Sequence, residues 1–139
     1  MEGKTEGVKK LTDFSVERSL TVVHSFVHSS ESKITSLTVS VPKNDRYCII
    51  SFSDKTNIIR VKLSLDEIAG LSDAVEKNRM WNCYHTFHRG EAAQTEVRMQ
   101  YNNNFINAEK SGVKIALKLT EDERASLTLL LQNLYARLL

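Results

Sequence analysis

The segment from Ile59 to Glu67 recurs 56 residues later, from Ile115 to Glu123. The two copies read IRVKLSLDE and IALKLTEDE. Self-similarity at one fixed offset is the sequence signature of a repeated structural unit. We therefore expect two copies of one unit, spanning about 18–78 and 79–139.

Each copy of the repeat predicts a strand that runs directly into a helix. Aliphatic residues alternate with basic or small ones, which is the period of a half-buried strand. The strands end at Ser64 and Thr120, and each hydroxyl residue is followed three places later by a glutamate, Glu67 or Glu123. This spacing is the capping box, in which hydroxyl and carboxylate satisfy free amides of the first helical turn.

Alternating residues and turn signals predict three further strands before the repeated junction in each half. The expected strands are 18–28, 34–42, 46–53, 57–63, 80–89, 94–102, 104–109 and 113–119, and the expected helices are 65–77 and 121–138. The predicted fold class is α+β, a tandem duplication of four antiparallel strands plus one helix. Residues 13–139 form one domain, and residues 1–12 are expected to be a flexible, solvated tail.

A weaker match suggests how the halves differ in length. His24–Phe26 resembles His85–Phe87 at an offset of 61. This offset predicts five extra residues in the first half, which we assign to the polar loop at 29–33.

The C-terminal helix has leucines on several of its sides. A helix of this kind is usually buried from more than one direction. We therefore predict a homo-oligomer, a dimer or tetramer; the alternative is that the helix lies across the sheet of its own chain. The residues expected at the subunit interface are Leu127, Leu130, Leu131, Leu134 and Leu138.

The composition is typical of a folded globular domain in a reducing compartment. Hydrophobic residues make up 41% and charged residues 26% of the 139 positions, which is ordinary for such domains. No stretch approaches the roughly 20 apolar residues of a membrane span, and the first residues lack the apolar core of a secretory signal. The two cysteines give no disulfide framework. We expect an intracellular protein with no membrane partner.

Two tandem units of four strands and a helix resemble the Whirly fold. That architecture is shared with trypanosomatid guide-RNA-binding proteins and, as a single unit that dimerises, with the transcriptional positive cofactor four family. Residues 112–123 resemble the junction of the latter family, where a basic strand ends in Leu-Ser or Leu-Thr before an acidic, leucine-bearing helix. The lysine- and glycine-rich strand signature of plant Whirly proteins is not matched by residues 109–114. The resemblance implies binding of single-stranded DNA or RNA along the sheets, with helices packed between subunits.

The distribution of charge agrees with that expectation. Binding of single strands needs cations for phosphates and flat side chains for bases. Basic residues lie on the polar faces of the predicted strands, whereas acidic residues concentrate at the helix starts. For any one lysine, the alternative is a solvated side chain that protects a sheet edge. The candidate nucleic-acid-binding residues are Arg60, Lys62, Tyr84, Arg89, Arg98, Tyr101, Lys114 and Lys118.

Patterns of catalytic and metal-binding residues are sparse. The sequence has no glycine-rich phosphate loop, nucleophile elbow or zinc-protease helix. Cys83 and His85 share a strand face, but His88 points the other way, and no fourth ligand follows at a matching spacing, although Cys48 could lie near in space. We predict that the protein is not an enzyme and that it binds neither a cofactor nor a metal.

The sequence thus predicts a non-catalytic protein that binds single-stranded nucleic acid, with DNA favoured over RNA. The alternative is a protein-interaction or scaffold module that oligomerises through its leucine-rich C-terminal helix.

Overall fold

The computed structural model describes residues 20–89 and 93–139, and for residues 87–89, 93 and 94 it describes the backbone only. The tail predicted at 1–12 lies outside the described residues. The elements are β1 (Leu20–Ser29), β2 (Ile34–Pro42), β3 (Cys48–Ser53), β4 (Ile58–Leu63), α2 (Leu65–Lys77), β5 (Trp81–Arg89), β6 (Ala93–Asn102), β7 (Phe105–Lys110), β8 (Val113–Lys118) and α3 (Glu121–Leu138).

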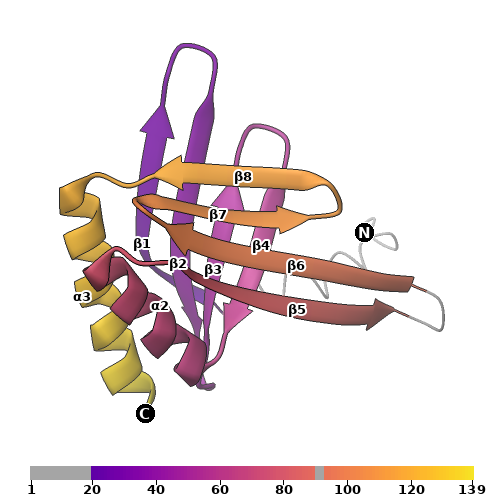
Figure 1. The fold of residues 1–139 in the computed structure, drawn as a ribbon. Helices are drawn as coiled ribbons and strands as arrows, with labels where there is room; N and C mark the ends of the chain where they lie inside the picture. Colours follow the sequence, from indigo (N-terminus) through magenta and orange to yellow (C-terminus); the bar gives the residue numbers. More distant parts are fainter. Residues whose placement is uncertain (1–19, 90–92) are drawn as a thin grey trace, which may run out of the picture.

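The described chain folds into two four-stranded antiparallel sheets, each followed by a helix (Figure 1). The first sheet has the order β1-β2-β3-β4 and the second the order β5-β6-β7-β8. The strands of the second sheet cross those of the first, and α2 and α3 lie side by side (Figure 1). The predicted α+β class and its tandem arrangement are confirmed.

One hydrophobic core lies between the two sheets and the helix pair. Strands β2, β3 and β4 of the first sheet contact β7 and β8 of the second, and buried residues of both sheets belong to a single cluster. Side chains alternate along each strand, so each sheet turns one face to this core and the other to solvent. The two outer faces therefore lie on opposite sides of the molecule.

Both capping boxes are formed. In α2, the Oγ of Ser64 accepts from the N–H of Glu67 at 3.3 Å, and Glu67 Oε1 accepts from the N–H of Ser64 at 3.0 Å. In α3, the corresponding distances for Thr120 and Glu123 are 3.1 and 2.9 Å.

Of the helices that the structure describes, neither is long and apolar enough to cross a membrane.

The leucines of α3 pack within their own chain, which corrects the predicted subunit interface. Leu127 and Leu131 are 0% exposed and Leu134 is 1% exposed. Leu130 and Leu138 are partly buried against the same core. Arg124 ties α3 to the end of α2, because its guanidinium donates to the carbonyl of Val75 at 3.0 Å. The apolar face of α3 is therefore covered by the chain's own sheets and α2.

The sheet register shows which positions of the two halves are equivalent. Ile59 and Ile115 correspond, because they lie 56 positions apart like the rest of the repeat. Their cross-strand rows can be followed through the pairing of neighbouring strands. These rows are Phe26–Leu37–Phe52–Ile59 and Cys83–Met99–Ala108–Ile115.

Phe26 is therefore equivalent to Cys83, and His28 to His85. The sequence match of His24 with His85 is wrong by four residues. Its error is a register error: a shift of four residues along a strand keeps the same face, so the alternation pattern could not reveal it.

The difference in loop length also lies elsewhere than predicted. Phe26 and its partner Leu37 are 11 positions apart, whereas Cys83 and Met99 are 16 apart. The hairpin with five extra residues is thus in the second half, between β5 and β6. The first half has six extra residues between β2 and β3, since Leu37 and Phe52 are 15 apart while Met99 and Ala108 are 9 apart.

Packing of α3 within its own chain can be tested by two leucine truncations. Leu131→Ala should lower the free energy of unfolding by about 2–5 kcal/mol, because it leaves a cavity in the core. Leu129→Ala should change it by no more than about 0.5 kcal/mol, because Leu129 is 67% exposed. Urea unfolding followed by circular dichroism measures both, and equal effects of the two changes would contradict this packing.

Candidate nucleic-acid interface

Three of the predicted binding residues meet on the outer face of the second sheet. Tyr84, Arg98 and Lys114 lie in one cross-strand row, with Glu109 between Arg98 and Lys114. Alternation within each strand directs all four side chains away from the core. Sequence reasoning found the three candidates but missed the carboxylate among them.

Carboxylates partly neutralise this row. Arg98 Nη2 lies 2.8 Å from Glu109 Oε1, and the hydrogen bond from Arg98 holds the pKa of Glu109 below its ordinary value. The hydroxyl of Tyr84 donates to Glu96 Oε1 at 2.6 Å, and this hydrogen bond raises the pKa of Tyr84. Exposed pairs of this kind are weak and exchange readily with other ligands.

A second aromatic ring lies at the other end of the same face. Phe105 pairs with Lys118 across β7 and β8, and the Lys118 ammonium lies 5.8 Å from the ring centroid. Phe105 is 47% exposed and Tyr84 is 56% exposed. Sequence reasoning missed Phe105, although its phase opposite to the buried Ile106 was a usable signal.

The row borders a cavity of about 430 Å³ at the turn between β7 and β8. Tyr84, Arg98 and Glu109 line it together with Lys110 and Gly112. Gly112 has φ +81°, a left-handed conformation that glycine adopts without strain. The cavity has the size of a small-ligand site.

Arg60 and Lys62 lie on the outer face of the first sheet, on the opposite side of the molecule. Both are exposed on β4, and the Lys62 ammonium lies 4.2 Å from the centroid of the Tyr47 ring. The rest of this face is rich in hydroxyl groups, including a pair between Ser25 and Thr38 at 2.9 Å. The predicted set is therefore divided between two surfaces.

Tyr101 lies in the core rather than on a binding face, so base stacking on it is a wrong prediction. It is 0% exposed, and its hydroxyl donates to Asn78 Oδ1 at 2.6 Å. The cause is register, because Tyr101 lies between Trp81 and Ile106 on the inner face. The side chain of Arg89 lies outside the described part of the chain.

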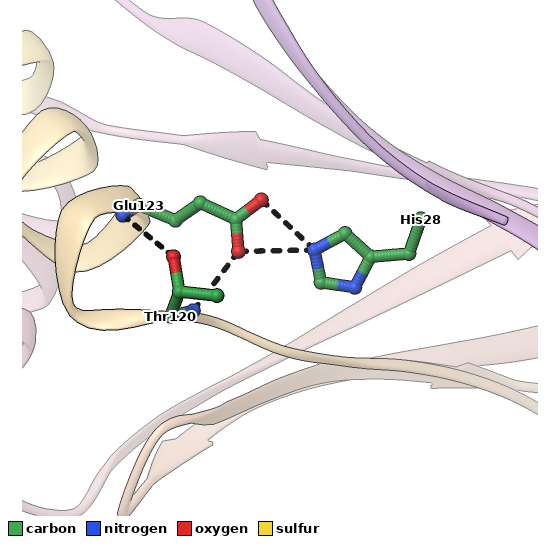
Figure 2. Close-up of polar contacts among 3 residues, drawn as sticks. All are labelled: His28, Thr120 and Glu123. Atoms are coloured by element: carbon green, nitrogen blue, oxygen red, sulfur yellow. Dashed lines mark hydrogen bonds and ion pairs between the residues drawn. The ribbon is translucent and has the colours of Figure 1, made fainter.

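At the start of each helix, the glutamate of the capping box forms a hydrogen bond with a histidine from the other half. Figure 2 shows Glu123 between Thr120 of its own capping box and His28 of β1. The Nε2 atom of His28 lies 3.0 and 2.9 Å from the two carboxylate oxygens. In the second such pair, His85 Nε2 lies 2.8 Å from Glu67 Oε2. The equivalent positions of the two histidines could have signalled these pairs in the sequence.

Cys83 adjoins the second of these pairs. The ligand atoms of Glu67, Cys83 and His85 all lie within 4.8 Å of one another. Cys83 and His85 share the inner face of β5, as predicted, while the side chain of His88 lies outside the described part. Burial, and then the charge of Glu67, raise the pKa of the Cys83 thiol to about 12.

A scan of the chain against protein-family models finds no match, and a search among curated proteins finds no similar sequence. Function must therefore be inferred from the side chains and their arrangement.

The His28–Glu123 pair should make stability depend on pH. Burial raises the pKa of Glu123, but hydrogen bonds from Thr120 and His28 outweigh it and hold the pKa below its ordinary value of 4.5. Because folding lowers this pKa, its contribution to stability is present above pH 4.5 and is lost as pH falls through the folded pKa.

Glu123→Gln should therefore lower the free energy of unfolding at pH 7 by about 1 kcal/mol. This gap from the unmodified protein should close as the pH is lowered below 4.5. Urea unfolding at a series of pH values measures it, with the exposed Glu121→Gln as the matched control. A gap that persists unchanged in acid would contradict the role of the carboxylate charge.

Proposed function

We propose that this protein binds single-stranded nucleic acid, without catalysis, on the outer face of its second sheet. The observation that carries the proposal is the grouping of flat and cationic side chains on one exposed sheet surface. We call it the β5–β8 face, and its binding residues are Tyr84, Arg98, Phe105, Lys114 and Lys118.

The two rings suit bases and the three cations suit phosphates. Exposed aromatic rings stack on bases of any sequence, and each stacked base contributes about 1–3 kcal/mol. Tyr84 on β5 and Phe105 on β7 lie toward opposite ends of the face. Arg98 on β6 pairs with Tyr84, and Lys118 on β8 pairs with Phe105. Such a surface favours an unpaired strand, because the bases of a duplex already stack on one another and are not free to cover the rings.

The negative charges of Glu96 and Glu109 lower the affinity of this face for nucleic acid. A phosphate can replace Glu109 on Arg98, because a guanidinium binds phosphate and carboxylate with the same two-pronged geometry. The pair is exposed, so this exchange leaves no charge buried. We therefore expect moderate affinity that depends strongly on salt.

The resemblance in architecture supports the same proposal. Two four-stranded antiparallel sheets, each followed by a helix, are the arrangement on which the resemblance to the Whirly and guide-RNA-binding proteins rests. By that resemblance, the expected ligand is single-stranded DNA or RNA, and we propose that DNA is preferred. That the protein forms a homo-oligomer stays a prediction. Its interface would have to lie elsewhere than the buried leucines of α3.

A titration at several salt concentrations tests the binding face. Labelled oligo-dT should bind more tightly than duplex DNA or oligo-rU, and binding should weaken steeply with salt. Lys114→Gln should reduce the slope of log affinity against log salt by about 0.7, the value for one phosphate contact on a single strand.

Lys62→Gln is the matched control, because Lys62 lies on the opposite face and should leave the slope unchanged. A slope lowered by Lys62→Gln instead would show that the other face binds. No binding at micromolar protein would reject the proposal.

Glu109→Gln should tighten the binding of oligo-dT several-fold at low salt. The change removes a negative charge from the β5–β8 face and releases Arg98 for a phosphate. Glu76→Gln is the control, because this exposed carboxylate belongs to α2. Fluorescence anisotropy measures all three proteins, and weaker binding by Glu109→Gln would contradict the proposed role of Arg98.

A protein-interaction module is the second candidate function. It is favoured by Leu129, which is 67% exposed on α3 and borders a cavity of about 370 Å³ that Val75 and Thr128 also line. The titration separates the two candidates, since a scaffold has no reason to bind single strands in preference to duplex.

A further inference from the structure

We propose that Glu67, Cys83 and His85 form a zinc-binding site where the start of α2 meets β5. Their ligand atoms all lie within 4.8 Å of one another. The carboxylate and the imidazole are already in contact, at 2.8 Å between Glu67 Oε2 and His85 Nε2. The proposal is separate from nucleic-acid binding, and neither depends on the other.

The chemistry of the three groups selects the metal. A thiolate, an imidazole and a carboxylate are the ligands that zinc takes in proteins, and three protein ligands leave one position of a tetrahedral ion open. With metal–ligand bonds of about 2.0–2.3 Å, the ligand atoms around zinc lie about 3.3–3.6 Å apart. The carboxylate and imidazole need to separate only slightly to admit the ion.

The fold holds the three side chains in place before any metal arrives. Cys83 and His85 are two residues apart on β5 and so project from the same face. Glu67 is fixed at the first turn of α2, because its Oε1 accepts from the N–H of Ser64 at 3.0 Å. That bond leaves Oε2 directed toward His85. Ligands carried by a strand and a capped helix lose little freedom on binding.

A cavity gives the site access to solvent. Its volume is about 380 Å³, and Glu67 and His85 line it together with Tyr47 and Lys62. Asp45, Arg46 and Ser64 also line it, so water can reach the ion as the fourth ligand. The Lys62 ammonium is held over the Tyr47 ring, at 4.2 Å from its centroid.

The first half of the chain provides an internal comparison. The pair of His28 and Glu123 repeats the contact of His85 and Glu67, but Phe26 occupies the position equivalent to Cys83. A histidine and a carboxylate are therefore enough to link a capped helix to the opposite strand. The thiol of Cys83 is additional to that link, and it is the group that would turn the pair into a metal site.

A cysteine beside a histidine and a glutamate also suggests a nucleophile, but the environment argues against one. Activated thiols have a lowered pKa, whereas burial and Glu67 raise the pKa of Cys83 to about 12. A bound zinc ion would displace the thiol proton outright. Cys48 is also buried, and Glu67 adds to the rise of its pKa, so a test must separate the two thiols.

Titration of the reduced 139-residue protein with Co²⁺ and then Zn²⁺ tests the site. One equivalent of Co²⁺ should give a thiolate-to-cobalt charge-transfer band in the near ultraviolet, and Zn²⁺ should remove it. Cys83→Ser should abolish the band and weaken Zn²⁺ binding by more than about 100-fold, since even outer-shell changes cost about 10–100-fold. Cys48→Ser should keep both the band and the affinity.

Cys83→Ser should leave the Glu67–His85 contact in place, and circular dichroism and urea unfolding in the presence of chelator check that the variant is folded. A second variant, Glu67→Gln, keeps a side-chain oxygen that can accept from the N–H of Ser64, and it should also weaken Zn²⁺ binding. The proposal is overturned if Cys83→Ser retains the band, if Cys48→Ser loses it, or if millimolar Co²⁺ gives none.

Discussion

The capping box at each strand-to-helix junction sets where the helix begins and also links the two halves of the molecule. Its glutamate does two things at once: it accepts from the backbone at the helix start, and it contacts a histidine of the opposite half, His28 or His85. Each half therefore fixes the other through the first turn of its helix. These contacts hold the start of each helix against the first strand of the other half, beside the hydrophobic core that the two sheets and the helix pair share.

Most of the fold could be predicted from the sequence, because its signals are local. Alternation, turns and the two hydroxyl–glutamate pairs placed all eight strands and both described helices within two residues of their bounds. Register and partners across the halves could not be predicted, because they depend on hairpin lengths. Thus His24 was matched in place of His28, and the leucines of α3 were assigned to a second subunit although their own chain buries them.

The candidate binding face was predicted only in part, for a related reason. Alternation shows which residues of one strand share a face, but not which faces of two sheets share a surface. Lys62 and Lys114 therefore looked alike in the sequence, and they lie on opposite sides. Tyr101 was misjudged because a tyrosine has an apolar ring and a polar tip, so its type fits the core and the surface equally well. The capping box fully explains a glutamate at position 67, so nothing in the sequence pointed to its second contact, with His85.

The outer faces of the two sheets differ in a way that duplication within one chain makes possible. One carries hydroxyl pairs such as Ser36 and Ser53, whose oxygens lie 2.6 Å apart, beside the cations Arg60 and Lys62, whereas the other carries the Arg98–Glu109 ion pair and exposed rings. Two identical subunits joined by symmetry must present the same surface twice, and any mutation alters both. Two units joined by a peptide bond are free to diverge. One half can keep an outer face rich in hydroxyl groups while the other half changes its chemistry.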